Sequence, residues 1–172
     1  MIRKLRLFGL TCFVLLITAC SSMIHKQDIK LPLDKKYAVS SFWNYTETPM
    51  AGLRASTIVE SVLSKSNPLL ISLISGSSET ESHSSKKDFI EAKKAEAKRL
   101  GADYLVLGNV QEWRYKTGID GEPVVSFNIN IIDLKTNKRV FSGVGAKSAW
   151  GHKSIGIVAQ EIAEDLIPLF IK

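Results

Sequence analysis

Few residues of this sequence have the types and spacing that catalysis or metal binding requires. The three histidines, His25, His83 and His152, are far apart and lack the spacing of metal ligands. Asp103 and Asp133 suit turn or strand-end positions better than an acid–base pair. The sequence also lacks a nucleophile elbow, a Walker loop and a dinucleotide fingerprint. We therefore predict that the protein is not an enzyme and holds no metal or cofactor.

Cys20 is the residue whose chemistry the sequence indicates most clearly. A basic stretch at residues 3–6 precedes an apolar run at 7–18. The run is too short to cross about 30 Å of hydrocarbon comfortably and has the length of a signal-peptide core. It ends in ITAC, residues 17–20, which resembles a bacterial lipobox. This resemblance implies that a signal peptide, residues 1–19, is removed and that Cys20 receives a diacylglycerol and an N-acyl group. The alternative is an ordinary secretory signal in which Cys20 is incidental.

The lipid would decide where the mature chain works, because several acyl chains together give lasting membrane attachment. Ser21 stands where an aspartate would mark retention in the inner membrane. We therefore predict a lipid anchor at the periplasmic face of the outer membrane. Cys12 lies within the removed segment, so Cys20 would be the only cysteine left and no internal disulfide is possible.

The charge of the chain gives little support to a nucleic-acid partner. The formal net charge of +6 belongs partly to the basic start of the signal, and the mildly basic remainder is compatible with contact to anionic lipids. Trp113 and Tyr115, with Arg114 between them, could suggest a nucleic-acid face. On a strand they are better explained by sheet packing and a subunit contact. We expect membrane lipids as a partner and no nucleic acid.

The sequence predicts a single α+β domain at 36–172, preceded by a lipidated polar tether at 20–35. Helical spacing and strand alternation of apolar residues locate the elements. They are, in chain order, a strand at 37–45, a helix starting at Thr48 and Pro49, a short buried strand at 68–75, a helix at 88–100, three strands within 102–116, 123–134 and 139–146, and a last helix at 154–170. This β-α-β-α-β-β-β-α order predicts a mixed, mostly antiparallel sheet with about three helices packed against it.

The serine-rich stretch at 75–87 is predicted to be a mobile surface loop, because it cannot bury enough apolar area to order itself. The helix that follows has a thin apolar face of Phe89, Ala92 and Leu100. We expect this helix to lie on the outside of the sheet.

The loop between the first and second of the three consecutive strands carries Asp120 and Glu122. Asp120 with Gly121 makes a good hairpin turn, because aspartate tolerates the turn backbone and glycine supplies a positive φ. The same short exposed loop is also acidic, and repeated copies of it would attract cations.

Trp150 also has two interpretations. It could fill the core at the start of the last helix, or it could lie at a membrane surface. The second interpretation is favoured by the nearby cations Lys147, His152 and Lys153, since an aromatic ring flanked by cations is typical of residues at the head-group level.

Several segments together resemble the PelC family of Pel exopolysaccharide-export lipoproteins. They are FWNYTETPMAGLRA, GADYLVLGNVQEWRYKTGIDGEP, VVSFNINIIDLKTNKRVFSG and SAWGHKSIGIVAQEIAEDL. The likeness runs from about residue 37 to the end and includes the lipobox. The strand GADYLVLG alone is less specific, because it recurs among lipoproteins related to the curli secretion channel protein and to the TolB amino-terminal domain.

The resemblance implies a structural role in secretion of a biofilm matrix polymer. Proteins of this family form a ring of many subunits at the outer membrane, around the barrel through which a cationic, amino-sugar polysaccharide leaves. The implied partners are other copies of the chain, a PelB-like barrel and TPR export protein, and the polymer. Matched by motif, the acidic lumen position falls on Asp120, with Glu122 beside it, and the membrane tryptophan on Trp150. The alternative is a monomeric periplasmic binding or regulatory lipoprotein of another envelope assembly.

Overall fold

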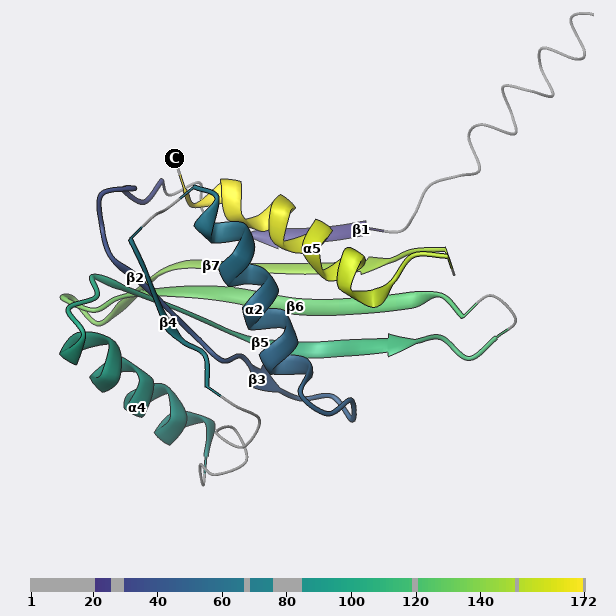
Figure 1. Cartoon of the computed structure of the whole chain (residues 1–172), viewed down its shortest axis with the longest axis horizontal. Helices are drawn as coiled ribbons and strands as arrows, with labels where there is room; N and C mark the ends of the chain where they lie inside the picture. Colours follow the sequence, from purple (N-terminus) through teal and green to yellow (C-terminus); the bar gives the residue numbers. More distant parts are fainter. Residues whose placement is uncertain are drawn as a thin grey trace, which may run out of the picture.

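A mixed sheet of seven strands is the centre of the computed structural model, which describes residues 21–25, 30–66, 69–75, 85–118, 121–150 and 152–171 (Figure 1). The strands are β1 (Ser21–His25), β2 (Tyr37–Ser40), β3 (Trp43–Asn44), β4 (Leu70–Leu73), β5 (Tyr104–Tyr115), β6 (Pro123–Asp133) and β7 (Lys138–Ser148). The helices are α2 (Ala51–Ser64), α4 (Lys86–Arg99) and α5 (Ile155–Leu166), followed by the short 3-10 helix η1 (Ile167–Leu169). The prediction of a single α+β domain is confirmed.

The strands follow the order β1-β7-β6-β5-β2-β4, and β3 also pairs with β5. Strands β5, β6 and β7 form an antiparallel meander, as their short connections require. Strand β2 pairs in parallel with both β4 and β5, because α2 and α4 serve as the crossover connections. The alternation along β6 directs its apolar residues Phe127, Ile129 and Ile131 into the core, as expected.

The two faces of the sheet are covered unequally. Helices α2 and α5 lie side by side over one face, where they enclose the larger core cluster (Figure 1). Helix α4 packs on the other face, over β4 and the first half of β5, with a smaller cluster that includes Ala97, Leu105 and Leu107. The polar side of β6, with Asn128 and Asn130, belongs to this second face.

The predicted polar tether is wrong at its start, because Ser21–His25 forms the edge strand β1. This strand pairs antiparallel with β7 and supplies partners for backbone groups that β7 would otherwise leave open. Met23 packs against the main core, whereas Ile24 faces outward. Farther along the expected tether, Leu31 is buried and forms a bridge with Ile171.

The start of α2 also differs from the prediction. Thr48 is not the N-cap; its hydroxyl donates to the carbonyl oxygen of Trp113 at 2.5 Å instead. Met50 is the N-cap residue, in the left-handed conformation with φ 60°. The helix then approaches the break between β2 and β3 closely, since a Cβ atom built on Gly52 would lie 2.0 Å from the carbonyl oxygen of Phe42.

Two further predictions are partly wrong. The strand near residues 68–75 exists as β4, but it is a half-buried edge strand rather than a buried one. Helix α4 begins at Lys86 after the N-cap Ser85, and 76–84 of the predicted loop lie outside the described residues. Its buried face consists of Phe89, Lys93 and Ala97, whereas Ala92 and Leu100 are exposed.

Candidate functional site at one end of the sheet

Three segments that are distant in the sequence meet at one end of the sheet. Ser21, the first residue of β1, pairs with Lys147 near the end of β7. Tyr115 at the end of β5 pairs with Pro123 at the start of β6. The backbone N–H of Ala149 donates to the carbonyl oxygen of Pro123 at 3.1 Å. The beginning of β1, the β5–β6 connection and the loop after β7 are therefore neighbours (Figure 1).

This end of the sheet exposes three large apolar side chains. Trp150, Tyr115 and Ile157 are 52%, 50% and 49% exposed. The interpretation of Trp150 as a residue that fills the core is therefore wrong. Trp113, two residues before Tyr115, is buried and packs in the main core, which confirms sheet packing for that tryptophan.

The same end fixes the start of α5. The hydroxyl oxygen of Tyr115 accepts a hydrogen bond from the backbone N–H of Ile155 at 3.2 Å. The hydroxyl oxygen of Ser154, the N-cap residue, accepts one from the N–H of Ile157 at 3.3 Å. These hydrogen bonds join the exposed aromatic side chains and the start of α5 into one surface. We define this surface by Tyr115, Trp150 and Ile157 and call it the Trp150 end.

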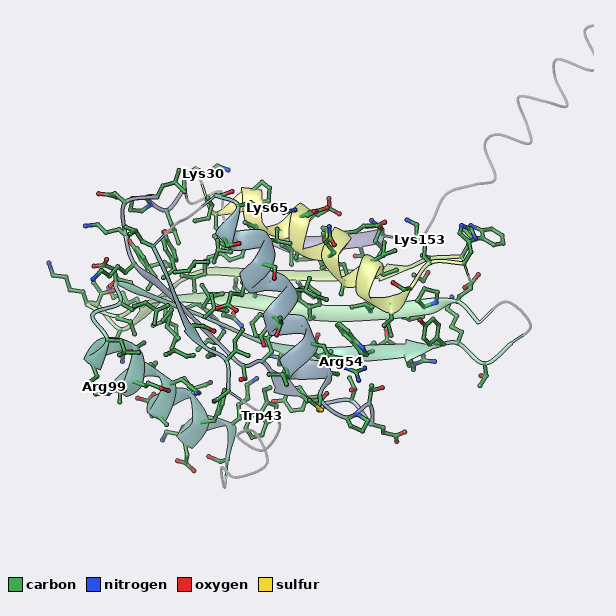
Figure 2. The ribbon with its side chains drawn as sticks, in the orientation of Figure 1. Lys30, Trp43, Arg54, Lys65, Arg99 and Lys153 are labelled. Carbon is green, nitrogen blue, oxygen red and sulfur yellow. The ribbon has the colours of Figure 1, made fainter. Side chains whose placement is uncertain are left out.

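Lys147 and Lys153 meet at one carboxylate behind this surface. Nζ of Lys147 lies 2.7 Å from Oε2 of Glu161, and Nζ of Lys153 lies 2.6 Å from Oε1. Figure 2 labels Lys153, which lies near the start of α5. Hydrogen bonds from Lys147 first and Lys153 second hold the pKa of Glu161 below its usual range. The backbone N–H of Lys153 also donates to the carbonyl oxygen of Trp150 at 3.0 Å. The ion pairs of Lys147 and Lys153 with Glu161, which we call the Glu161 clamp, therefore hold the loop that carries Trp150 against α5.

The clamp could not be predicted from the sequence. Lys147 and Lys153 were expected to face a membrane, but their ammonium groups turn toward α5, and the Lys147 side chain is only 18% exposed. Glu161 lies eight residues after Lys153 and on a different element from Lys147. No local spacing rule joins a strand residue to a residue two turns into the next helix.

The acidic hairpin is only partly described by the structure. Nζ of Lys116 lies 2.7 Å from Oε2 of Glu122, and the backbone N–H of Lys116 donates to the carbonyl oxygen of Glu122 at 2.7 Å. Lys116 therefore neutralises Glu122 and closes the hairpin. Asp120 lies outside the described residues.

Cys20 also lies outside the described residues, but its neighbour Ser21 is placed opposite Lys147, three residues before Trp150. His152 is exposed beside the same loop. Within the described ranges, no three His, Cys, Asp or Glu residues gather as a metal site would require. Among the helices of these same residues, none is long enough and apolar enough to span a membrane.

Comparison with known proteins supports the family resemblance at the level of the whole domain. The chain is similar to a PelC dodecamer from Paraburkholderia phytofirmans, with 29% identity, a TM-score of 0.74, and coverage of 89% of this chain and 99% of that chain. A dodecamer of a PelC variant from the same organism gives the same identity and TM-score, with 89% of this chain and 100% of that chain covered. The resemblance to PelC expected from the sequence is thereby confirmed.

A more distant solved structure shares the fold alone. A hypothetical protein from Chlamydia trachomatis is 14% identical, with a TM-score of 0.50 over 77% of this chain and 94% of that chain. No protein-family model matches the chain, and comparison with curated proteins gives no match.

Proposed function

We propose that the chain is a non-enzymatic outer-membrane lipoprotein that assembles into a ring of identical subunits and guides a cationic exopolysaccharide to its export barrel. The observation that carries this proposal is the similarity to the PelC dodecamer, which extends over 99% of that chain. A closed ring of identical subunits requires head-to-tail contacts, in which two different surfaces of each subunit meet.

The Trp150 end would face the membrane. If Cys20 carries acyl chains, the lipid begins one residue before the start of β1, whose Ser21 lies opposite Lys147. The exposed rings of Trp150 and Tyr115 are at that same end, and aromatic side chains with one polar edge favour the head-group level of a bilayer. Anchor and aromatic surface would then act on one membrane, and the Glu161 clamp would hold the Trp150 loop in place.

The acidic hairpin would face the polymer. Lys116 neutralises Glu122, so Asp120 would supply the negative charge of this loop that repeats from subunit to subunit. A ring of single carboxylates attracts amino groups without binding any one sugar tightly, which suits a polymer that must keep moving. The barrel partner in this scheme is a PelB-like outer-membrane protein.

Two substitutions at Asp120 test this function. In cells that depend on the introduced chain, Asp120→Asn should lower the amount of secreted cationic polysaccharide, and Asp120→Lys should lower it further because the sign of the repeated charge is reversed. Asparagine suits the same turn, so folding of that variant should change by no more than about 0.5 kcal/mol.

The measurement is secreted polysaccharide per cell, with the thermal midpoint and the oligomer size of each purified variant as controls. Normal secretion by a folded Asp120→Lys variant would show that Asp120 is only a turn residue. A monomeric wild-type chain would instead support the alternative of a binding or regulatory lipoprotein.

A further inference from the structure

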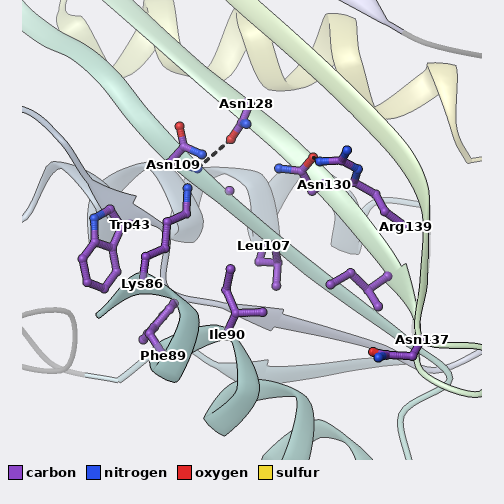
Figure 3. A pocket seen from close by; sticks show the side chains of 12 residues that line it. Trp43, Lys86, Phe89, Ile90, Leu107, Asn109, Asn128, Asn130, Asn137 and Arg139 are labelled. Carbon is purple, nitrogen blue, oxygen red and sulfur yellow. Dashed lines mark hydrogen bonds between the residues drawn. The ribbon is translucent and has the colours of Figure 1, made fainter. Parts of the chain in front are cut away.

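A cavity of about 390 Å³ lies between α4 and the sheet (Figure 3). None of the three residues that define the Trp150 end lines it. It is lined by the first turns of α4, by β3, and by β5 and β6 with the start of β7. The cavity lies on the face of the sheet opposite α2 and α5. Its volume is in the range of small-molecule sites, about 300–1,000 Å³.

One wall of the cavity presents fixed hydrogen-bond donors. Oδ1 of Asn128 accepts from the backbone N–H of Asn109 at 2.7 Å. Oδ1 of Asn130 accepts from the hydroxyl of Ser142 at 2.9 Å and from Arg139 at 3.5 Å. Since both amide oxygens are engaged, the orientation of each amide is set, and neither NH₂ group has an acceptor in the part of the chain that the structure describes. Two amide donors are therefore available beside the cavity.

The cavity is also positively charged. Lys86 and Arg139 line it from opposite sides, and none of the described residues that line it is acidic. Nζ of Lys86 lies 4.9 Å from the centre of the Tyr45 ring, and the described residues place no carboxylate in an ion pair with Lys86 or Arg139. A negatively charged ligand could thus form charge-assisted hydrogen bonds here that no carboxylate of the described residues already occupies.

The remaining walls are apolar and include an aromatic ring. Trp43 lies at one end, tilted at 59° against Phe89 with the ring centres 5.7 Å apart. Ile90 and Leu107 line the middle of the cavity (Figure 3). A ligand that fits this site has one apolar face, which packs against Trp43, Ile90 and Leu107. It also has a polar edge, whose hydrogen-bond acceptors face the two asparagine amides and the two cationic side chains.

We propose that this cavity binds an anionic saccharide, a pyranose unit that carries a carboxylate or a phosphate. A pyranose ring offers C–H groups on one face for Trp43, and hydroxyl oxygens at its edge for the Asn128 and Asn130 amides. Its acid group would pair with Arg139 or Lys86. The site does not depend on the proposed function, since a cationic amino sugar would be repelled by the same two side chains.

Calorimetric titration of the full chain, purified in a non-ionic detergent, tests the site. The probes are trigalacturonate for the carboxylate, glucose 6-phosphate for the phosphate, maltotriose as a neutral control and a glucosamine trimer as a cationic control. At least one anionic probe should bind about tenfold more tightly than maltotriose, and the glucosamine trimer should bind more weakly than maltotriose. Equal binding of neutral and anionic probes, or no binding of either anionic probe, would overturn the proposal.

Substitutions assign the binding to this cavity. Asn130→Asp keeps the oxygen that accepts from Ser142 but replaces a donor with a negative charge, so it should weaken anion binding by about tenfold or more. Arg139→Gln and Lys86→Gln should also weaken it. Arg99→Gln removes the same charge from the far end of α4 and should leave binding unchanged. If the folded Asn130→Asp and Arg139→Gln variants bind as well as Arg99→Gln does, the saccharide binds elsewhere and the proposal is wrong.

Discussion

Glu161→Gln should destabilise the fold and loosen the Trp150 loop. The substitution keeps the shape of the side chain but removes the charge that holds Lys147 at 2.7 Å and Lys153 at 2.6 Å. Hydrogen bonds to charged groups contribute about 1.5–3 kcal/mol each when well shielded. The Glu161 side chain is 25% exposed and the Lys153 side chain 39%, so solvent screening reduces these values. Lys147 also retains Asp165 at 4.0 Å as a second, weaker partner.

We therefore expect a loss of about 1.5–2 kcal/mol, which corresponds to roughly 3–8 °C in the thermal midpoint of a chain of this size. The matched control is Glu164→Gln, on the same helix. Glu164 pairs with Lys65 at 3.0 Å, but their side chains are 42% and 63% exposed, so solvent screens the pair and this substitution should lower the thermal midpoint much less than Glu161→Gln does. Thermal unfolding followed by circular dichroism measures both. Equal midpoints for the two variants would refute the role of the Glu161 clamp.

The same pair of variants gives a pH dependence with a defined sign. The pKa of Glu161 is lower in the folded chain than its usual value, because Lys147 and Lys153 stabilise the carboxylate. Its contribution is therefore present in full above the ordinary glutamate pKa of about 4.3, and is lost as the pH falls through the lowered folded value. The midpoint gap between wild type and Glu161→Gln should be full at neutral pH and should close in acid. A gap that is independent of pH would show that the substitution acts through packing alone.

Three further substitutions test the anchor, the exposed surface and the close packing of α2. Cys20→Ala should leave the chain soluble or uncleaved and abolish export, and a variant that still fractionates with the outer membrane would contradict lipidation. In that background, Trp150→Ala should lower sedimentation with anionic vesicles several-fold without unfolding the chain, whereas Leu100→Ala, exposed at the opposite end of the sheet, should not. Gly52→Ala should cost about 2–3 kcal/mol in urea unfolding because its Cβ would overlap neighbouring backbone, while Gly156→Ala, with no atom nearer than 3.9 Å, should be neutral or stabilising.

Segments with strong periodicity could be predicted well from the sequence. The alternation of Phe127, Ile129 and Ile131 located β6 and its buried face, and the helical spacing of Val158, Ile162 and Leu166 located α5. In both segments a single repeating pattern decides the structure.

The predictions that are wrong concern residues whose structure is determined by tertiary contacts. Ser21–His25 has the composition of a linker and forms a strand because the edge of β7 is open beside it. Thr48 has the residue type of an N-cap, but its hydroxyl reaches the carbonyl oxygen of Trp113 across the fold. Lys93 is buried on the inner face of α4 where an apolar residue is expected, and its ammonium group donates to the carbonyl oxygen of Leu73 at 3.1 Å.

The candidate site follows the same division. Trp150 could be singled out from its cationic neighbours, and its 52% exposure agrees with a surface position. The convergence of Ser21, Tyr115 and Trp150 at one end of the sheet could not be predicted, because it depends on the register of β1 on β7 and of β5 on β6. The cavity beside Asn130 could not be predicted, because its walls come from five different elements.

Assembly into a ring is the central claim, and the mass of the intact assembly tests it most directly. The full chain, extracted in a mild detergent, would be measured by native mass spectrometry and imaged by electron microscopy. By analogy with the PelC dodecamer, we predict a single closed species of twelve subunits whose images have cyclic symmetry. A monomer, or a two-fold dimer as the sole species at concentrations well above those of the cell envelope, would contradict the claim.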